Sequence, residues 1–557
     1  MAVQIHNLDP EKLSRRDAKM KLTDDGRPAT RAELGDARRE LSRNERIKLE
    51  KSGFDVWDDI VQRYQHGGFE SIDEEDFERF KWYGIYQQRP KNGHFMMRLK
   101  IPGGALNRAQ WRQVAHTARQ YARGVADIST RMSFQMHWLR IEDIPGIVER
   151  YKEVGLITRG ACGDVCRNVV SSPLAGIDPD EALDPTELVN EASNFFAYNP
   201  EFNDMPRKFK VCIGGNLAGI QSEVHEVVLY GVRRSDGSVG YGLRVGGGLS
   251  TEPYIAQDVR VFVTPEEAMK VLEATAVIYR DHGYRKSRKH ARYKYLVADW
   301  GAEHYREVLE DILGYALPDA EPLPEDYPGY EDRYGVHPQK QEGLSYVGVP
   351  VIAGRLNADQ LDAIGDIAEE FGTGDVRLTV MQSFYIINVP NEKTGEVVKR
   401  LEAAGLPVER SAIARGVVAC TGIQFCNLAV TETKERAQTI ARELDKNVQW
   451  KSSEFFRINV NGCPNSCGQH WVADVGLQGC TKKVDGELKE HFDMFLGGGL
   501  GHDAAYNRRI LRMPAEEVPA AIQRVMEAFE AQKQEGESFK QFCARHDDDT
   551  LAAMLSG

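Results

Sequence analysis

The alternation of hydrophobic and polar positions repeats along this chain. Residues 106–156 align without gaps on residues 356–406, at an offset of 250. Each copy predicts a loop, an amphipathic helix, an alternating strand and a second helix that ends at a glycine, Gly155 or Gly405. Residues 376–389, rich in β-branched and aromatic side chains, predict a strand or a hairpin. The pattern indicates an α/β (α+β) protein built from two related halves.

The repeat continues at two glycine-rich stretches. Residues 245–249 (VGGGL) match residues 496–500 (LGGGL) at an offset of 251. That offset places three side chains of the first half on three of the second: Cys212 on Cys463, Lys208 on Asn459 and Lys210 on Asn461. Neither stretch completes the dinucleotide-binding pattern G-x-G-x-x-G. Two copies are too few for a solenoid, so we expect a pseudo-twofold protein with one site at the junction of its halves.

Composition and charge narrow the class of protein. A length of 557 residues predicts three or four domains, and a net charge of −13 argues against a nucleic-acid partner. The N-terminus lacks the apolar core of a signal peptide, and no window approaches the ~18 apolar residues that span a membrane. We therefore expect a cytoplasmic protein without a membrane partner, in which cysteines serve metals or catalysis more often than disulfides.

The first 75 residues are expected to form an N-terminal arm. They mix both charges densely and carry few aromatic residues before Phe54 and Trp57. Residues 33–51 predict a polar helix. We favour a solvated arm without chemistry, and the alternative is an arm that wraps a neighbouring domain.

Two cysteine pairs predict a metal centre. The spacing is C-x5-C and then C-x3-C, in the sequences ACTGIQFCNLA and NGCPNSCG, and the four thiols are Cys420, Cys426, Cys463 and Cys467. This spacing differs from zinc ribbons and from the tight ferredoxin run. Cluster iron prefers four soft thiolates, and the flanking turn residues let the backbone approach a cluster. Buried structural cysteines, a structural zinc site and a plain electron-carrying cluster are the alternatives.

These motifs resemble those of the sirohaem-dependent sulfite and nitrite reductases. The similarity covers roughly residues 75–530 and includes FMMRLKIPGG at 95–104, DMPRKFK at 204–210, VHPQKQEG at 336–343 and ADVG at 473–476. The resemblance implies a three-domain fold with internal pseudo-twofold symmetry, and a [4Fe-4S] cluster joined to sirohaem through Cys467. The expected segments are the arm 1–75, two paired ferredoxin-like half-domains at 76–165 and 335–410, a sirohaem and substrate domain at 166–334, and a cluster domain at 411–557.

Four basic residues are matched by the resemblance to the distal face of the sirohaem: Arg98, Arg167, Lys208 and Lys210. Arginine offers a fixed fork of donors to an oxyanion, and a lysine in a crowd of cations becomes a better proton donor. Lys208 and Lys210 alternate with Phe209, so both are expected on one face of a strand. A surface salt bridge is the alternative for any one of them.

Further residues are assigned to the cofactor by the resemblance. Sirohaem carries eight carboxylates, and Arg131, in a strand predicted over 129–135, is one expected partner. Arg292, within the basic run 285–294, is the other, unless that run is an exposed helix face. Some ferredoxin-dependent relatives carry a Tyr–Cys thioether beside the site, and the matching residues here are Tyr86 and Cys162.

The sequence thus predicts an assimilatory sulfite reductase, which reduces sulfite to sulfide with six electrons. Lys210 favours sulfite, because the matching family position tends to be Asn in nitrite reductases. Nitrite reduction to ammonia and a non-enzymatic iron–sulfur electron carrier are the alternatives. The chain has no flavin or NADPH motif, so electrons must come from another protein. Residues 247–253 (GGLSTEP) favour ferredoxin over a flavoprotein as the donor, and we expect a monomer.

Overall fold

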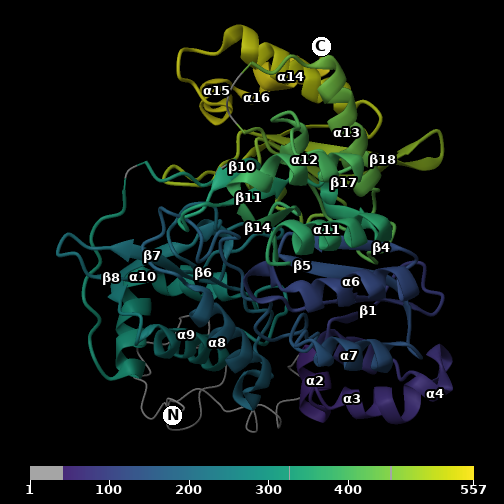
Figure 1. The fold of residues 1–557 in the computed structure, drawn as a ribbon, viewed down its shortest axis with the longest axis vertical. Helices are drawn as coiled ribbons and strands as arrows, with labels where there is room; N and C mark the ends of the chain where they lie inside the picture. Colours follow the sequence, from purple (N-terminus) through teal and green to yellow (C-terminus); the bar gives the residue numbers. More distant parts are fainter. Residues whose placement is uncertain (1–41, 325, 331, 452–454) are drawn as a thin grey trace.

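The computed structural model describes residues 42–324, 326–330, 332–451 and 455–557. Helices and sheets are mixed along the whole described chain, as the sequence predicts. The N-terminal helices lie at one end of the molecule and the C-terminal helices α14 (Val518–Gln532), α15 (Phe539–Arg545) and α16 (Asp548–Ser556) at the other (Figure 1).

The two half-domain repeats form two five-stranded sheets that exchange a strand. The first sheet has the order β1 (Ile85–Gln87), β2 (His94–Arg98), β5 (Ser133–Arg140), β4 (Val125–Ser129) and β12 (Arg355–Asn357). The second has the order β10 (Gly335–Pro338), β11 (Leu344–Val349), β14 (Phe384–Pro390), β13 (Val376–Leu378) and β3 (Ala105–Leu106). Since β12 pairs with β4 and β3 with β13, each repeat completes the sheet of the other.

The repeated helices are present where the sequence predicts them, and the second helix of each repeat ends at the predicted glycine. Helices α6 (Arg108–Tyr121) and α11 (Ala358–Phe371) both start with a capping box, formed by Asn107 with Gln110 and by Asn357 with Gln360. The second helices, α7 (Ile144–Glu153) and α12 (Thr394–Ala403), are each followed by a left-handed glycine, Gly155 and Gly405. Residues 376–389 form the hairpin β13–β14.

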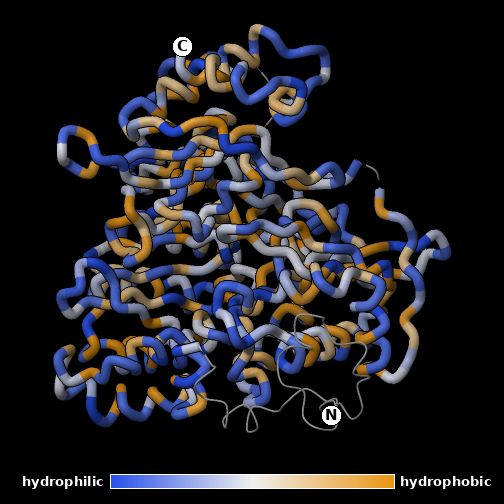
Figure 2. The backbone as a smooth tube through the Cα atoms, turned by 180° about the vertical axis from the view of Figure 1, so that it is seen from behind, coloured by the Kyte–Doolittle hydropathy of each residue, from blue (hydrophilic) through white to orange (hydrophobic). Residues whose placement is uncertain are grey.

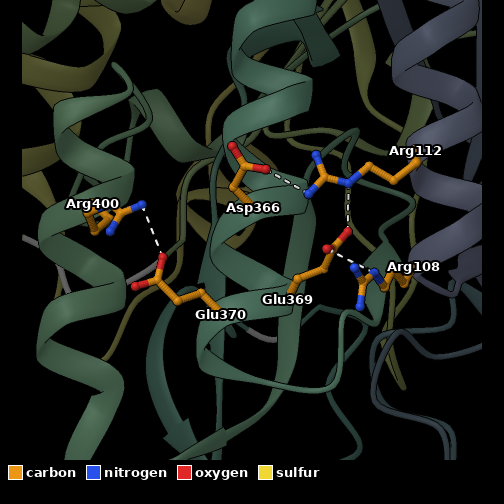
Figure 3. A pocket seen from close by; sticks show the side chains of 6 residues that line it. All are labelled: Arg108, Arg112, Asp366, Glu369, Glu370 and Arg400. Atoms are coloured by element: carbon orange, nitrogen blue, oxygen red, sulfur yellow. Dashed lines mark hydrogen bonds and ion pairs between the residues drawn. The ribbon is translucent and has the colours of Figure 1, made fainter.

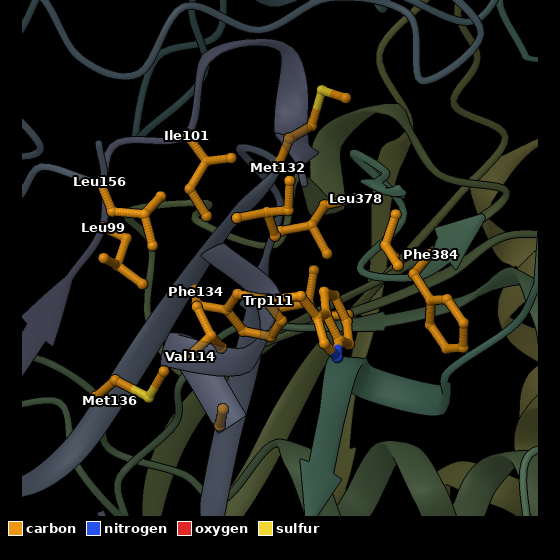
Figure 4. Close-up of a cluster of buried hydrophobic side chains, with 14 of the residues drawn as sticks. Leu99, Ile101, Trp111, Val114, Met132, Phe134, Met136, Leu156, Leu378 and Phe384 are labelled. Atoms are coloured by element: carbon orange, nitrogen blue, oxygen red, sulfur yellow. The ribbon is translucent and has the colours of Figure 1, made fainter. Parts of the chain in front are cut away.

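The two half-domain repeats share one hydrophobic core. Trp111 of α6 lies between Phe134 and Phe384, with ring centroids 5.6 and 6.3 Å away (Figure 4). Its indole Nε1 donates to the Leu361 carbonyl of α11 over 2.8 Å. On the surface, Arg112 of α6 forms ion pairs with Asp366 and Glu369 of α11, each 2.6 Å long (Figure 3). This packing holds the two repeats in one body.

Two further sheets repeat the second part of each half. One has the order β6 (Val211–Gly214), β7 (Val227–Arg233), β8 (Val239–Val245) and β9 (Gln257–Val263). The other has β15 (Val417–Ala419), β16 (Ile458–Asn461), β17 (Val475–Val484), β18 (Glu487–Leu496) and β19 (Arg508–Pro514). Helices cover both: α8 (Thr186–Tyr198), α9 (Ala268–His282) and α10 (Tyr293–Leu313) in the first half, and α13 (Lys434–Asn447) with α14 in the second.

The register of these sheets corrects one prediction. The amide of Val227 bonds to the carbonyl of Lys210, and the amide of Val475 bonds to that of Arg457. Lys210 therefore corresponds to Arg457 rather than to Asn461. The constant offset fails because the second half has a longer connection before β17 and a longer β17–β18 hairpin, which shift the alignment in between.

Residues 42–75 are packed against the protein, so the expectation of a solvated arm is wrong for this part. Helix α2 (Arg43–Glu50) buries Ile47, and Phe54 joins the main core. The buried Lys48 forms ion pairs with Asp204 at 2.8 Å and Asp164 at 3.6 Å. Residues 1–41, including the first part of the helix predicted over 33–51, lie outside the described residues.

No helix within the described ranges is long and apolar enough to cross a membrane. Hydrophobic and hydrophilic segments instead alternate closely along the backbone (Figure 2).

Candidate active site

The four predicted basic residues gather beside one cysteine. Arg98 ends β2, and Lys208 and Lys210 precede β6. The amide of Arg167 donates to the Phe209 carbonyl over 2.8 Å, which places Arg167 next to both lysines. Cys467 interacts electrostatically with Arg98 and with Lys208, where it opposes the lowering of the side-chain pKa that burial causes. Segments from both halves thus meet where the sequence predicts a junction site.

Lys208 is the most exceptional member of this group. Its ammonium has no hydrogen-bond or ion-pair partner among the described residues, although the side chain is mostly removed from solvent. Burial lowers its pKa well below the usual value, and the guanidinium groups of Arg292 and Arg167 lower it further. A desolvated cation without an ion-pair partner indicates a place for an anionic ligand.

Lys210 differs because it has a carboxylate partner. Its Nζ donates to the Val224 carbonyl over 2.9 Å and lies 3.4 Å from Glu226 Oε2. Burial lowers the pKa of Lys210 to about 8, and Glu226 opposes that shift. Glu226 also binds Arg292 through its Oε1, 2.9 Å from Arg292 Nε. Glu226 was not predicted from the sequence, since a carboxylate before a hydrophobic strand is ordinary.

The two residues expected to hold sirohaem carboxylates have different surroundings. Arg131 lies in the β4–β5 turn rather than in a strand, because the chain reverses at residues 130–132. The Arg131 guanidinium contacts His225 Nδ1 at 3.3 Å and the Asn168 carbonyl. Its Nε has no hydrogen-bond partner among the described residues. Burial lowers the pKa of Arg131 to about 10. Arg292 is buried against Glu226. Within the run 285–294, Lys286 and Lys289 are exposed but precede α10, which begins at Tyr293, so the run is not an exposed helix face.

The side chains of Tyr86 and Cys162 lie next to each other and close to Arg98. Arg98 Nη1 donates to Cys162 Sγ over 3.3 Å. Burial raises the pKa of both side chains, but the guanidinium groups of Arg98 and Arg167 leave the pKa of the Cys162 thiol lower than usual. A thiol favoured as thiolate beside a phenol is suited to the thioether that the resemblance implies.

A thioether between Tyr86 and Cys162 is therefore expected in the purified enzyme. Intact-mass analysis of the denatured, alkylated protein should show a loss of two hydrogens and one unreacted thiol. The Tyr86→Phe variant is the control and should alkylate at every cysteine. A full thiol count in the wild type would contradict the link.

The four cysteines of the two motifs also come together. Cys420, Cys426 and Cys463 each have a raised thiol pKa, first because they are buried and then because the Cys467 thiol is close. Backbone amides point at the sulfurs: Gly462 N lies 3.2 Å from Cys420 Sγ, and Leu428 N lies 3.4 Å from Cys426 Sγ. Buried thiols that meet amide donors suit an iron–sulfur cluster. In the described ranges, no three Cys, His, Asp or Glu side chains converge on a single-ion position.

A chain of hydrogen bonds connects the cysteine loops to the basic group. Thr130 Oγ1 donates to the Cys467 carbonyl over 3.0 Å, and Gln135 Nε2 donates to Thr421 Oγ1 over 3.2 Å. Gln135 Oε1 in turn accepts from Arg98 Nη2 at 3.3 Å. These polar residues of the β4–β5 hairpin were not predicted from the sequence, because their role depends on the contact between halves.

Unsatisfied buried atoms test whether a polar cofactor suits this site. Among the described residues, several side-chain atoms beside the site are buried without a partner, and they include Arg98 Nε, Arg131 Nε, Asn459 Oδ1, Asn461 Nδ2 and Ser466 Oγ. Native proteins leave few such groups unpaired. Together with the unpartnered Lys208, they fit a large, carboxylate-rich group such as sirohaem.

The fold and the site define a class of protein: redox enzymes that act on a small anion beside an iron–sulfur centre. The family model described as the nitrite and sulphite reductase 4Fe-4S domain matches residues 162–316 and 412–552. The model of the nitrite/sulfite reductase ferredoxin-like half domain matches residues 86–154 and 337–404. The chain belongs to the nitrite and sulfite reductase family, whose members carry sirohaem and a [4Fe-4S] cluster, and it is an oxidoreductase. The zinc-protein and electron-carrier alternatives are therefore wrong.

The similar proteins cover nearly the whole chain. Sulfite reductase [ferredoxin] 1 of Mycolicibacterium paratuberculosis is 38% identical over 542 residues, which are 93% of this chain and 97% of the relative. The assimilatory ferredoxin-dependent nitrite reductase of Haloferax mediterranei is 36% identical, over 92% of this chain and 93% of the relative. The solved structure of the NirA protein of Mycobacterium tuberculosis matches with a TM-score of 0.90 and 37% identity, over 94% of this chain and 100% of that chain.

Proposed function

We propose that this enzyme is an assimilatory sulfite reductase that takes electrons from ferredoxin and reduces sulfite to sulfide. The observation that carries the proposal is the pair of lysines beside Arg98 and Arg167, one of them without a carboxylate partner. Near neutral pH sulfite is present as a monoanion and a dianion, and two ammonium groups suit the dianion better than one. Relatives named ferredoxin-dependent sulfite reductases, at 38% identity, support this choice.

Different residues of this chain would bind the substrate, donate protons and hold the cofactors. Arg98 and Arg167 would bind substrate oxygens, since guanidinium forks stay charged at all working pH values. Lys208 and Lys210 would hold protons at Nζ and donate them as sulfur–oxygen bonds break. Cys420, Cys426, Cys463 and Cys467 would hold the [4Fe-4S] cluster, and Arg131 and Arg292 the sirohaem carboxylates. When bound, these cofactors supply the electrons and the iron that accepts the substrate.

The comparison of two substrates tests the proposal directly. With reduced ferredoxin as donor, the purified enzyme should show a higher kcat/KM for sulfite than for nitrite. The reverse order would favour the alternative function, a ferredoxin-dependent nitrite reductase. Two relatives, at 36% and 35% identity, are named as such nitrite reductases.

The electron donor has its own test. Ferredoxin is favoured by the names of the relatives. Activity with reduced ferredoxin should exceed that with NADPH and a flavoprotein subunit, and the reverse would assign the flavoprotein. A monomeric state and a cytoplasmic location remain predictions of the sequence.

The rate should depend on pH through the lysines. Burial lowers the pKa of Lys210 to about 8, so its Nζ loses the proton as the pH rises through that value. The kcat/KM for sulfite should therefore fall above pH ~8, by up to tenfold per pH unit. A profile from pH 6.5 to ~9.5 measures this. Nitrite remains a monoanion over this whole pH range. A pH dependence measured with nitrite therefore reports the titration of the enzyme, without that of the substrate. A flat profile for both substrates would contradict the assignment.

Replacing Lys210 by Asn should change the substrate preference. The amide keeps a hydrogen bond but removes the charge that a dianion needs. We expect kcat/KM for sulfite to fall by about ten- to a hundredfold, or ~1.4–2.7 kcal/mol, and that for nitrite to fall less or to rise. Steady-state kinetics of the variant with both substrates measure the change. An equal loss for both substrates would show that Lys210 does not set the preference.

A further inference from the structure

The pseudo-twofold symmetry generates a second copy of part of the active site. Lys210 and Arg457 occupy the same position before β6 and β16, and Glu226 and Asp474 the same position before β7 and β17. The ion pair of Lys210 with Glu226, 3.4 Å, is thus repeated by Arg457 Nε with Asp474 Oδ2, 3.3 Å.

The glycine-rich stretches are repeated in the same way. Gly246 N bonds to the Glu226 carbonyl, and Gly497 N bonds to the Asp474 carbonyl. The third glycine of each stretch lies near a lysine. A Cβ on Gly248 would approach Arg292 Nη2 at 2.8 Å and Lys294 Cδ at 3.5 Å, and one on Gly499 would approach Lys540 Cδ at 2.8 Å. The repeated set therefore comprises an ion pair, a glycine turn and a lysine.

A cavity of about 250 Å³ lies at this second set. It is lined by residues of the cluster half and by one connecting segment, among them Tyr330, Phe455, Arg457, Asp474, Gly499 and Lys540. The strands that follow Arg457 and Asp474 and the helix of Lys540 belong to the C-terminal part of the fold, where β17 and α15 are labelled (Figure 1). The cavity is smaller than the ~300–1,000 Å³ of pockets for drug-sized ligands.

Arg457 is the side chain with capacity left for a ligand. It is 6% exposed, and its guanidinium carbon lies 4.7 Å from the Tyr330 ring centroid. Its Nε is used by Asp474, but in the described part of the chain Nη1 and Nη2 have no hydrogen-bond partner. Two free nitrogens on one edge of a buried guanidinium match a carboxylate.

One of the differences between the two sites decides the ligand. Lys208, two residues before Lys210, is replaced by Phe455, two residues before Arg457. The second cavity thereby loses the unpartnered ammonium and gains an aromatic face, with the Phe455 and Tyr330 ring centroids 6.0 Å apart at 33°. An aromatic face favours a flat ring over a small inorganic anion.

We propose that this cavity is a second ligand site, separate from the sulfite site, and that it binds a small carboxylate that carries a flat ring. Arg457 Nη1 and Nη2 bind the carboxylate, and Phe455 and Tyr330 contact the ring. The proposal does not depend on which anion the enzyme reduces.

Titration of the holoenzyme with benzoate tests the site, with calorimetry for affinity and the visible haem spectrum for the sulfite site. Benzoate should bind with an unchanged haem spectrum, and cyclohexanecarboxylate and inorganic phosphate more weakly. The double variant R457Q/D474N, which replaces the charged pair by a neutral one, should weaken binding at least tenfold, or about 1.4 kcal/mol. Sulfite reduction should be unaffected.

Two further variants keep the result decisive. Phe455→Ala leaves the ion pair intact and should also weaken benzoate binding, so the test survives if the double variant fails to fold. Arg112→Gln, which breaks a surface ion pair at the α6–α11 contact (Figure 3), should bind as the wild type does. The proposal is overturned by no binding at ~10 mM benzoate, by a haem spectral change on binding, by phosphate binding more tightly, or by Arg457 and Phe455 variants that bind normally.

Discussion

The Cys463→Ser enzyme is expected to lose its iron and acid-labile sulfide and all sulfite reduction. Cys463 is buried, and its thiol interacts with those of Cys467 and Cys426. Serine offers a hard, protonated oxygen in place of a thiolate, and a site built from four thiolates cannot be completed by three. Since cluster binding and folding are coupled, the C-terminal half should also unfold at a lower temperature.

Iron and sulfide assays with thermal unfolding measure this result. Cys480→Ser is a matched control, because Cys480 lies on β17 outside the two motifs and should keep its iron. Cys420→Ser should behave as Cys463→Ser does. Cys467→Ser should in addition change the haem spectrum, since Cys467 also faces Arg98 and Lys208. Iron content at the wild-type level in both Cys420 and Cys463 variants would refute the ligand set.

Local signals explain which parts of the fold could be predicted. The repeated helices were predictable because a capping box needs only residues three apart, as in Asn107 with Gln110. The exchanged strands were not, since the contact of Arg355 with Asp127 joins residues 228 positions apart. The packing of residues 42–75 was missed for the same reason: Lys48 looks solvated in the sequence, and only the fold supplies Asp164 and Asp204.

In the candidate site, too, local sequence features could be predicted and contacts between distant residues could not. The cysteine spacing and the alternation of Lys208 with Lys210 can be read directly from the sequence. Glu226 could not be predicted, although it distinguishes the two lysines, because its partners come from the residue before β6 and from the start of α10. Charge type and spacing therefore find the cations, but only the fold shows which of them is neutralised.

Because Lys210 is paired with Glu226 and Lys208 is not, replacing Lys208 should have the largest effect of any single substitution near the substrate. Lys208→Met should lower kcat/KM for sulfite by about 10²–10³-fold, or ~2.7–4 kcal/mol, the range for one strong donor in a closed site. The fold should not suffer. Lys208 is desolvated and forms no hydrogen bond or ion pair among the described residues, so its removal breaks no such contact. It relieves repulsion from Arg292 and removes only a longer-range attraction to Glu226. The midpoint of thermal unfolding should stay the same or rise.

Lys210→Met is the matched control, and it should show the opposite balance. Its removal breaks one of the two ion pairs that the buried Glu226 carboxylate forms among the described residues and leaves the pair with Arg292, so this variant should unfold at a lower temperature than the wild type. The two variants are compared by their kcat/KM for sulfite and by their midpoints of thermal unfolding. The comparison separates an ammonium that only binds the substrate from one that also stabilises the fold. A Lys208→Met enzyme with wild-type kcat/KM, or one that is destabilised as much as Lys210→Met, would show that Lys208 is a structural cation.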